Sequence, residues 1–148
     1  MGGGSGHLKQ YFQRHDEYYF VVQRRHDQNR EGLAALFDFD ATKQSAQLGR
    51  LVLRPGSFAS ADTALLLLRL AFGMFKLAEV WGFTLTTNAP MIAYLRSCGF
   101  EQRGFMKVAI GDESHDAANF VMTREQWRTV EEQLAQLAQR IAQTIQYR

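Results

Sequence analysis

The sequence predicts a single mixed α/β domain in which an antiparallel sheet precedes a long apolar helix. Segments rich in β-forming residues alternate with polar turns over the first third of the chain. A strand at 47–54 then passes through small and polar residues into an apolar helix at 62–75. Another strand follows this helix at 79–86, and a crossover helix favours a parallel arrangement of the two strands that it joins.

The N-terminal elements are predicted in order from their composition. Residues 1–6 (MGGGSG) are typical of a tag or linker, and we exclude them from the domain. The polar segment 7–16 has its apolar residues on one side and predicts a short helix or turn. Strands at 17–24 and 32–39 form a hairpin. A polar turn at 40–45 leads into the central strand, so three antiparallel strands precede the long helix.

The segment after the second parallel strand is predicted as a short helix at 87–97. Asn88 can cap this helix, Pro90 fits its first turn, and Gly99 is placed to end it. Two antiparallel strands follow at 100–110 and 117–123, around the turn GDESHD.

The C-terminal helix, 124–148, is predicted to be long and amphipathic. Thr123 and Gln126 form a capping box at its start. An apolar stripe along this helix either packs across the body of the domain, 7–123, or pairs two copies of the chain. The stripe consists of Trp127, Val130, Leu134, Leu137, Ile141 and Ile145.

Composition excludes several classes of function. The chain of 148 residues is 46% hydrophobic and 22% charged, which is typical of a soluble globular domain. A net charge of +2 without a Lys/Arg-rich block argues against nucleic acid as a partner. No apolar run reaches the length of a membrane span, and GDES lacks the further ligands of a calcium loop. The single Cys98 excludes an internal disulfide and is consistent with the cytoplasm.

The connection between the central strand and the long helix is the first candidate site. A buried strand that turns through small residues into a helix leaves backbone N–H groups directed at one point, and this geometry suits an anion such as a pyrophosphate. An ordinary strand-to-helix connection has the same pattern, so the loop alone does not decide between the two interpretations.

Two stretches, LVLRPGSFASADTALLLLRLAF and TNAPMIAYLRSCGF, resemble the GNAT superfamily of N-acetyltransferases. In the second stretch Asn88, Ile92, Gly99 and Phe100 stand at the family's spacing. HDAANFVMTREQW and AALFDFDATKQSAQLG are similar to the subgroup that acetylates amino sugars or ribosomal proteins. The resemblance covers 18–127. It implies that the family's first strand and first two helices, which form one wall of the acceptor site, are largely absent.

The resemblance implies an acetyl-CoA-dependent N-acetyltransferase that acts on a small amine, with an amino sugar as one candidate acceptor. It places the cofactor's pyrophosphate on the loop backbone and its pantetheine arm along the central strand. The implied cofactor-binding residues are Leu51, Val52, Leu53, Arg54, Gly56, Ser57, Phe58, Ala59, Ser60, Ala61 and Asn88.

The sequence departs from the family at both catalytic positions. The family's tyrosine, which protonates the leaving thiolate, is Leu95 here, and Tyr94 stands about 100° away around the helix. A central-strand Glu that often serves as base is replaced by Gln47. Tyr94 and His115 are the predicted catalytic residues, with a core or surface tyrosine and a solvated turn histidine as the alternatives. Much of the rate of acyl transfer can nevertheless come from positioning of the reactants.

The other candidate bases and nucleophiles have simpler explanations. Asp38 and Asp40 are typical turn-forming residues, and Asp116 belongs to the turn GDESHD. Cys98 is predicted to be a buried structural thiol. The alternative function is a catalytically degenerate domain that binds acyl-CoA or dimerises through its C-terminal helix, and Phe58 filling the cofactor cleft would favour it.

Overall fold

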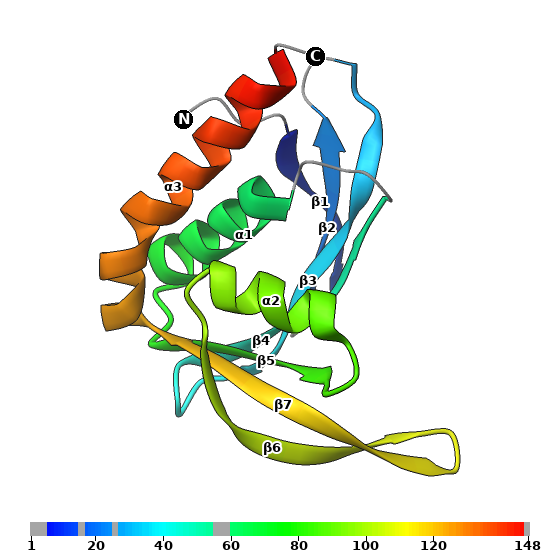
Figure 1. The fold of residues 1–148 in the computed structure, drawn as a ribbon. Helices are drawn as coiled ribbons and strands as arrows, with labels where there is room; N and C mark the ends of the chain where they lie inside the picture. The colour runs from blue at the N-terminus through cyan, green and yellow to red at the C-terminus, as the bar shows by residue number, and fades with distance from the viewer. Residues whose placement is uncertain (1–5, 15–16, 25–26, 55–59, 147–148) are drawn as a thin grey trace.

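The sheet has seven strands, and all but one pair of neighbours are antiparallel. The computed structural model of the protein describes residues 6–14, 17–24, 27–54 and 60–146, with side chains described within 17–143. The strand order is β1-β2-β3-β4-β5-β7-β6, and only β4 and β5 are parallel (Figure 1). The strands are β1 (Gly6–Arg14), β2 (Glu17–Arg24), β3 (Arg30–Asp40), β4 (Ser45–Leu53), β5 (Glu79–Leu85), β6 (Glu101–Ile110) and β7 (Glu113–Thr123).

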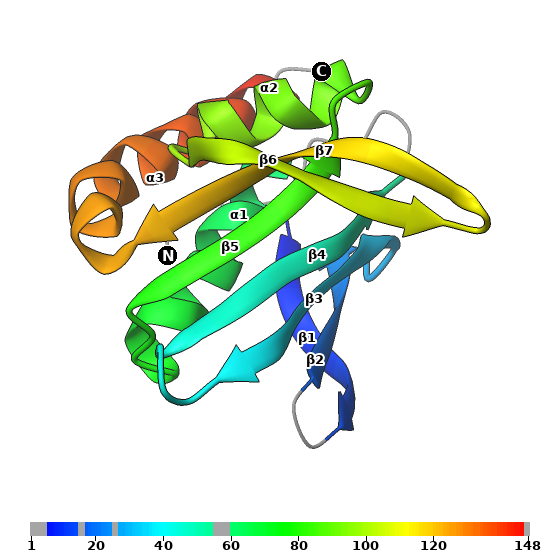
Figure 2. The same ribbon diagram turned by 90° about the horizontal axis from the view of Figure 1, so that it is seen from below.

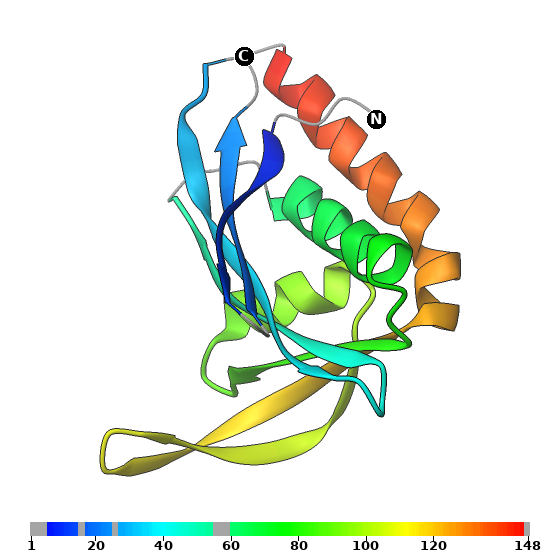
Figure 3. The ribbon, with the colours of Figure 1, turned by 180° about the vertical axis from the view of Figure 1, so that it is seen from behind.

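The helices lie on one face of this sheet, as Figures 1 and 3 show from opposite sides. They are α1 (Ser60–Arg69), which continues as the π-helical turn η1 (Leu70–Met74), α2 (Ala89–Ser97) and α3 (Arg124–Gln146). In Figure 2 the sheet stands in front of all three α-helices, and none of the described helices covers the face turned to the viewer. We call these two sides the covered face and the open face.

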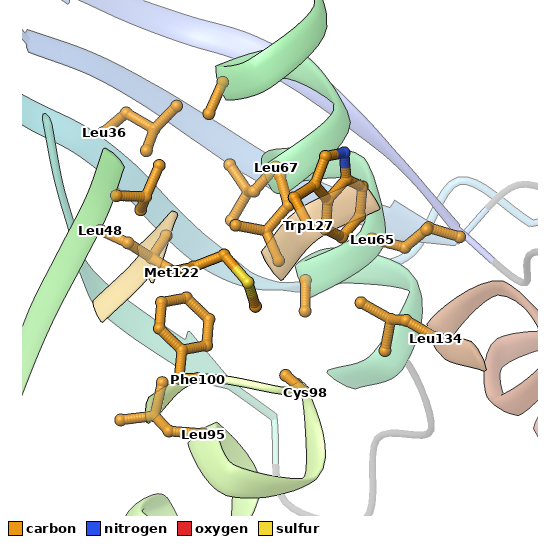
Figure 4. Packing of buried hydrophobic residues seen from close by; sticks show 14 of the residues in the cluster. Leu36, Leu48, Leu65, Leu67, Leu95, Cys98, Phe100, Met122, Trp127 and Leu134 are labelled. Atoms are coloured by element: carbon orange, nitrogen blue, oxygen red, sulfur yellow. The ribbon is translucent and has the colours of Figure 1, made fainter. Parts of the chain in front are cut away.

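The hydrophobic core fills the space between the covered face and the helices (Figure 4). Alternation along each strand directs every second side chain into it, as with Phe120 and Met122 of β7, which are fully buried. Leu67 and Leu68 of α1 meet them from the helical side and are 1% exposed. Each such side chain stabilises the fold by about 1.5–3 kcal/mol through its burial. The apolar character of α1 is thereby explained.

The stripe of α3 packs within the chain. Trp127 is 5% exposed and stacks on Phe72 with their ring centroids 5.9 Å apart. Leu134 and Ala138 are also buried, and Arg69 of α1 forms an ion pair with Glu131 of α3 at 2.9 Å. The stripe from Trp127 to Ile141 thus packs across the body of the domain, while the side chain of Ile145 lies outside the described residues. Pairing of two copies through this helix stays a prediction.

The local signals at the helix ends are confirmed. The Asn88 side chain accepts a hydrogen bond from the Met91 amide at 3.3 Å, with Pro90 in the first turn of α2. Gly99 follows α2 with a φ of +96°. The capping box of α3 is closed in both directions between Thr123 and Gln126, at 2.9 and 3.2 Å.

Two predicted elements are wrong in their type or extent. Residues 6–14 form β1, a strand rather than a short helix or turn, because they pair with β2 along its whole length. Four antiparallel strands, not three, therefore precede α1. The resemblance implies that the family's first strand and first two helices are largely absent. A strand, β1, nevertheless precedes β2, and the two residues between β1 and β2 are too few for a helix. The predicted turn GDESHD is shorter in the structure and consists of Gly111 and Asp112, because residues 113–116 pair with β6 and belong to β7.

Candidate functional site

β4 and β5 diverge after a short parallel ladder. They pair only between 45–47 and 79–81, although β4 continues along β3 to Leu53 and β5 along β7 to Leu85. At the point of divergence, a Cβ placed on Gly82 would lie 2.7 Å from the Leu48 carbonyl oxygen. Within the described residues, the facing backbone edges of the two strands have no ladder partner beyond this point. The sheet is thus opened in its middle.

A cavity of about 270 Å³ lies on the covered face beside this opening. Its lining is mainly apolar and comes from three elements: Leu51 and Leu53 of β4, Ser60 of α1, and Asn88, Pro90, Met91 and Tyr94 of α2. We call this cavity the groove.

A β-bulge in β4 selects the side chains that line the groove. The register between β3 and β4 slips at Arg50, which adopts a φ of +52°. The slip shifts the alternation by one residue, so Leu51 and Leu53 face the helices and Val52 faces the open side, where it is 63% exposed. The Arg50 guanidinium turns to the open face and lies 4.2 Å from the centroid of the Phe37 ring.

Tyr94 ties the two helical walls of the groove together. Its hydroxyl donates a hydrogen bond to the Ser60 carbonyl oxygen at 2.7 Å, which joins α2 to the first residue of α1. Burial, with a smaller contribution from the neighbouring Cys98, raises the pKa of the Tyr94 phenol well above its ordinary value. Burial likewise raises the pKa of Cys98 to about 11. Both shifts make these two groups weaker acids than an exposed tyrosine or cysteine.

The remaining implied cofactor residues are distributed unevenly. Leu51, Leu53, Ser60 and Asn88 line the groove, whereas Ala61 is buried in the core and Arg54 is exposed. The Arg54 amide donates to the Glu31 carbonyl at 2.6 Å and so is already engaged. Gly56, Ser57, Phe58 and Ala59 lie outside the described residues. Sequence reasoning missed Pro90 and Met91 as lining residues, although their place in the first turn of α2, beside Asn88, was a usable signal.

The two predicted catalytic residues lie in different places. Tyr94 lines the groove, but His115 stands in β7 opposite Val108, beyond the last pair of β7 with β5. Its Nε2 is 3.4 Å from a carboxylate oxygen of Glu113. Leu95, at the position of the family's tyrosine, is buried in the core, and Gln47 is buried at the last β4–β5 pair.

The described part of the chain holds no cluster of metal ligands and no helix suited to crossing a membrane. No group of three or more His, Cys, Asp and Glu side chains there is arranged to hold a metal ion. None of the helices there combines the length and the apolarity that crossing a bilayer requires.

No protein-family model matches the sequence, and no curated protein matches it. Solved structures do match its fold. A spermidine N-acetyltransferase from Vibrio cholerae, in complex with CoA and spermine, superposes with a TM-score of 0.70 at 18% identity, over 77% of this chain and 69% of that one. A GCN5-related N-acetyltransferase from Brucella melitensis gives 0.77 at 17% identity, over 83% of this chain and 58% of that one. The chain therefore has the fold of the GNAT N-acetyltransferases.

Proposed function

We propose that this protein is an acetyl-CoA-dependent N-acetyltransferase that acts on a small amine. The observation that carries the proposal is the opening between β4 and β5 with an apolar groove beside it. A similar fold in the Vibrio cholerae structure accompanies bound CoA and spermine, and this supports the same class of ligands here.

The residues around the opening fit the chemistry of an acyl-CoA. The pantetheine arm carries amide groups, and the unpaired edges of β4 and β5 offer backbone donors and acceptors for them. Leu51, Leu53 and Met91 supply apolar contacts along its methylene units. The N-terminus of α1, where Ser60 lines the groove, is the favourable end of the helix for a phosphate. Bound there, acetyl-CoA supplies an activated thioester.

Tyr94 and His115 remain our proposed catalytic residues, in different roles. Acyl transfer needs a neutral amine and a proton for the departing thiolate. Tyr94 lines the groove, and its hydroxyl can give a proton to the departing thiolate once it releases the Ser60 carbonyl oxygen. His115 is a partly exposed imidazole that can take a proton from an incoming ammonium. If these roles are correct, Tyr94→Phe and His115→Ala each lower the rate of CoA release at saturating acetyl-CoA.

The experiment is a calorimetric titration of acetyl-CoA, followed by measurement of thiol release with a panel of amines that includes amino sugars. Leu53→Glu places a charge in the groove, and Leu33→Glu is its matched control because the Leu33 side chain is 52% exposed on the open face. We expect a dissociation constant of about 1 μM to 1 mM for the wild type and the control, and no binding for Leu53→Glu. Absence of binding to the wild type would refute the proposal.

A second candidate is a domain that binds acyl-CoA without turnover. Three observations favour it. The Tyr94 hydroxyl already donates its hydrogen bond to a backbone carbonyl oxygen, and the position of the family's tyrosine holds Leu95, which is buried in the core. The position of the family's central-strand Glu holds Gln47. Acetyl-CoA binding without thiol release across the amine panel would support this alternative. Dimerisation through α3 is less favoured, because its stripe already covers α1.

The single buried Cys98 fits a cytoplasmic protein.

A further inference from the structure

The β6–β7 hairpin extends beyond the rest of the sheet (Figure 1). β7 pairs with β5 only as far as Ala117, the partner of Leu85, whereas β6 and β7 stay paired up to Ile110 and Glu113. Within the described residues, β7 is the one strand that pairs with β6, so the other edge of β6 has no ladder partner. A two-stranded ribbon is only marginally stable in water by itself. The outer edge of β6 is therefore a place where a further strand can add.

The sequence of β6 does little to prevent such pairing. Natural sheets protect their exposed edges with charged residues, proline or bulges. Between Phe105 and Ile110 the chain has no proline and one charged residue, Lys107, whose ammonium is 2.5 Å from a carboxylate oxygen of Asp116 in the same hairpin. Phe105 is 72% exposed and Ile110 is 51% exposed. The bulge in β6 lies before this segment, between Gln102 and Phe105, and leaves 105–110 in regular register with β7.

Alternation along β6 assigns the side chains of 105–110 to the two faces of the sheet. Phe105 is the cross-strand partner of the core residue Ala118 and so belongs to the covered face. Every second residue after Phe105 faces the same side, and the residues between them face the open side. The open-face residues are Met106, Val108 and Ile110. All three are apolar, so this series has the same character when it is read in either direction.

A second copy of β6 fits this edge best in one register. Antiparallel pairing about a two-fold axis keeps like faces together, and the residue on the axis meets its own copy. A register centred on Lys107 places two ammonium groups opposite each other, which is destabilising. One centred on Met106 reaches the bulge and sets Ile110 opposite Gln102. A register centred on Val108 instead sets Met106 of each copy opposite Ile110 of the other, so that every open-face pair is apolar.

The register centred on Val108 is also complementary in charge at both ends. It places Gly104 of one copy opposite Asp112 of the other. The neighbouring Arg103 then lies beside the carboxylates of Asp112 and Glu113 in the second copy. The Arg103 guanidinium is 3.6 Å from Glu101 of its own chain and has further N–H groups to donate. Because the axis is two-fold, this contact between opposite charges occurs twice.

We propose that a second copy of this chain adds to the outer edge of β6 and forms a dimer with one continuous sheet. Backbone hydrogen bonds between the two β6 strands hold the copies together, and the apolar open-face series sets their register. The pairing covers apolar side chains that the single chain leaves exposed. It involves neither the groove nor the stripe of α3, and it is independent of the proposed function.

Sedimentation equilibrium of the purified chain between about 1 and 500 μM tests the proposal. We expect a species of twice the chain mass of 16.9 kDa, with a dissociation constant of about 1–100 μM, because one pair of strands is a small interface. Val108→Lys sets two ammonium groups opposite each other on the axis and should weaken association by about tenfold or more. Leu33→Lys is the matched control, since Leu33 is a 52% exposed residue of β3, and should leave association unchanged. Circular dichroism checks that both variants fold.

Oxidative cross-linking tests the register. Val108→Cys sets two thiols opposite each other at a spacing that a disulfide can bridge, whereas the thiols of Ile110→Cys lie about 13 Å apart along the strands. We expect a covalent dimer for Val108→Cys and none for Ile110→Cys, although Ile110 is the more exposed of the two. The wild type, with its buried Cys98, is the control.

Three results would overturn the proposal: a monomer at every concentration, a dimer that Val108→Lys leaves intact, or equal cross-linking of the two cysteine variants. The second result would place the contact elsewhere, for example along α3. Acetyl-CoA titration reports separately on the groove, so the failure of either proposal leaves the other standing.

Discussion

The covered and open faces of the sheet differ in how far the side chains of the same strands are buried. On the covered face, alternate residues such as Phe120 and Met122 are fully buried against helices, and the groove beside them is apolar. On the open face Leu33, Val52 and Phe83 remain 52%, 63% and 38% exposed, and a polar cavity there is lined by Asp38, Asp40 and Glu79. The covered face therefore carries the apolar burial that stabilises the fold together with an apolar cavity, while the open face leaves polar and charged side chains accessible.

The strongest test of this comparison removes one side chain from each face. Phe120→Ala should lower the free energy of unfolding by about 3–5 kcal/mol, because it leaves a cavity in the core. Val52→Ala should change it by about 0.5 kcal/mol or less. Urea unfolding followed by circular dichroism measures both. A large loss for Val52→Ala would mean that the open face is covered in solution.

The titration of Cys98 on the covered face gives a pH test. The ordinary pKa of a thiol is 9.0 and that of folded Cys98 is about 11, so the unfolded chain loses this proton first as the pH rises. Stability is therefore full below pH 9 and falls by about 3 kcal/mol between pH 9 and 11. The raised pKa of Tyr94 adds to the fall in the upper part of this range.

Chemical unfolding at a series of pH values in the presence of a reductant measures this fall. Cys98→Ala should remove the part that begins near pH 9. Identical pH profiles for the variant and the wild type would show that the thiol is not held protonated by burial.

The third test concerns the line along which the sheet opens. Gly82→Ala places a methyl group 2.7 Å from the Leu48 carbonyl oxygen and should cost about 1–3 kcal/mol of stability, with weaker acetyl-CoA binding. Gly73→Ala is the control, since its Cβ would meet nothing within 4 Å. Thermal unfolding and calorimetry report the two effects. Equal melting temperatures for both variants would argue against the close approach of β4 and β5.

The smallest expected effect is at the cap of α2, beside the groove. Asn88→Ala removes the acceptor of the Met91 amide and should cost about 1 kcal/mol, whereas Asn88→Asp should restore the cap. Weaker acetyl-CoA binding in both variants would assign Asn88 a direct contact with the ligand. If only the alanine variant binds more weakly, the residue acts through the helix alone.

Much of the fold was predictable because its signals are local. β2 has the predicted bounds, the caps at Asn88 and Thr123 are where the sequence places them, and β4 and β5 are parallel as the crossover requires. The type of 6–14 was mispredicted because its strand conformation depends on pairing with β2. The β-propensity of a segment carries no information about the strand with which it pairs.

The candidate site divides in the same way. Leu51, Leu53, Ser60 and Asn88 line the groove with Tyr94, and their contact with a cofactor stays a prediction. The polar cavity on the open face, lined by Asp38 and Asp40, is not predicted by the sequence, in which both residues are typical of turns. They gain a different meaning only when Glu79 and Asn119, some 40 and 80 positions further along the chain, lie beside them.

Local sequence patterns determine the helix caps and the apolar segments that build the core, because these depend on neighbours within a few residues. Tertiary structure alone decided where β4 leaves β5, which face each side chain of a bulged strand occupies, and how the Tyr94 hydroxyl is engaged. The physical reason is that strand register and bulges are set by pairing with distant segments. A shift of one residue there exchanges the two faces of the sheet.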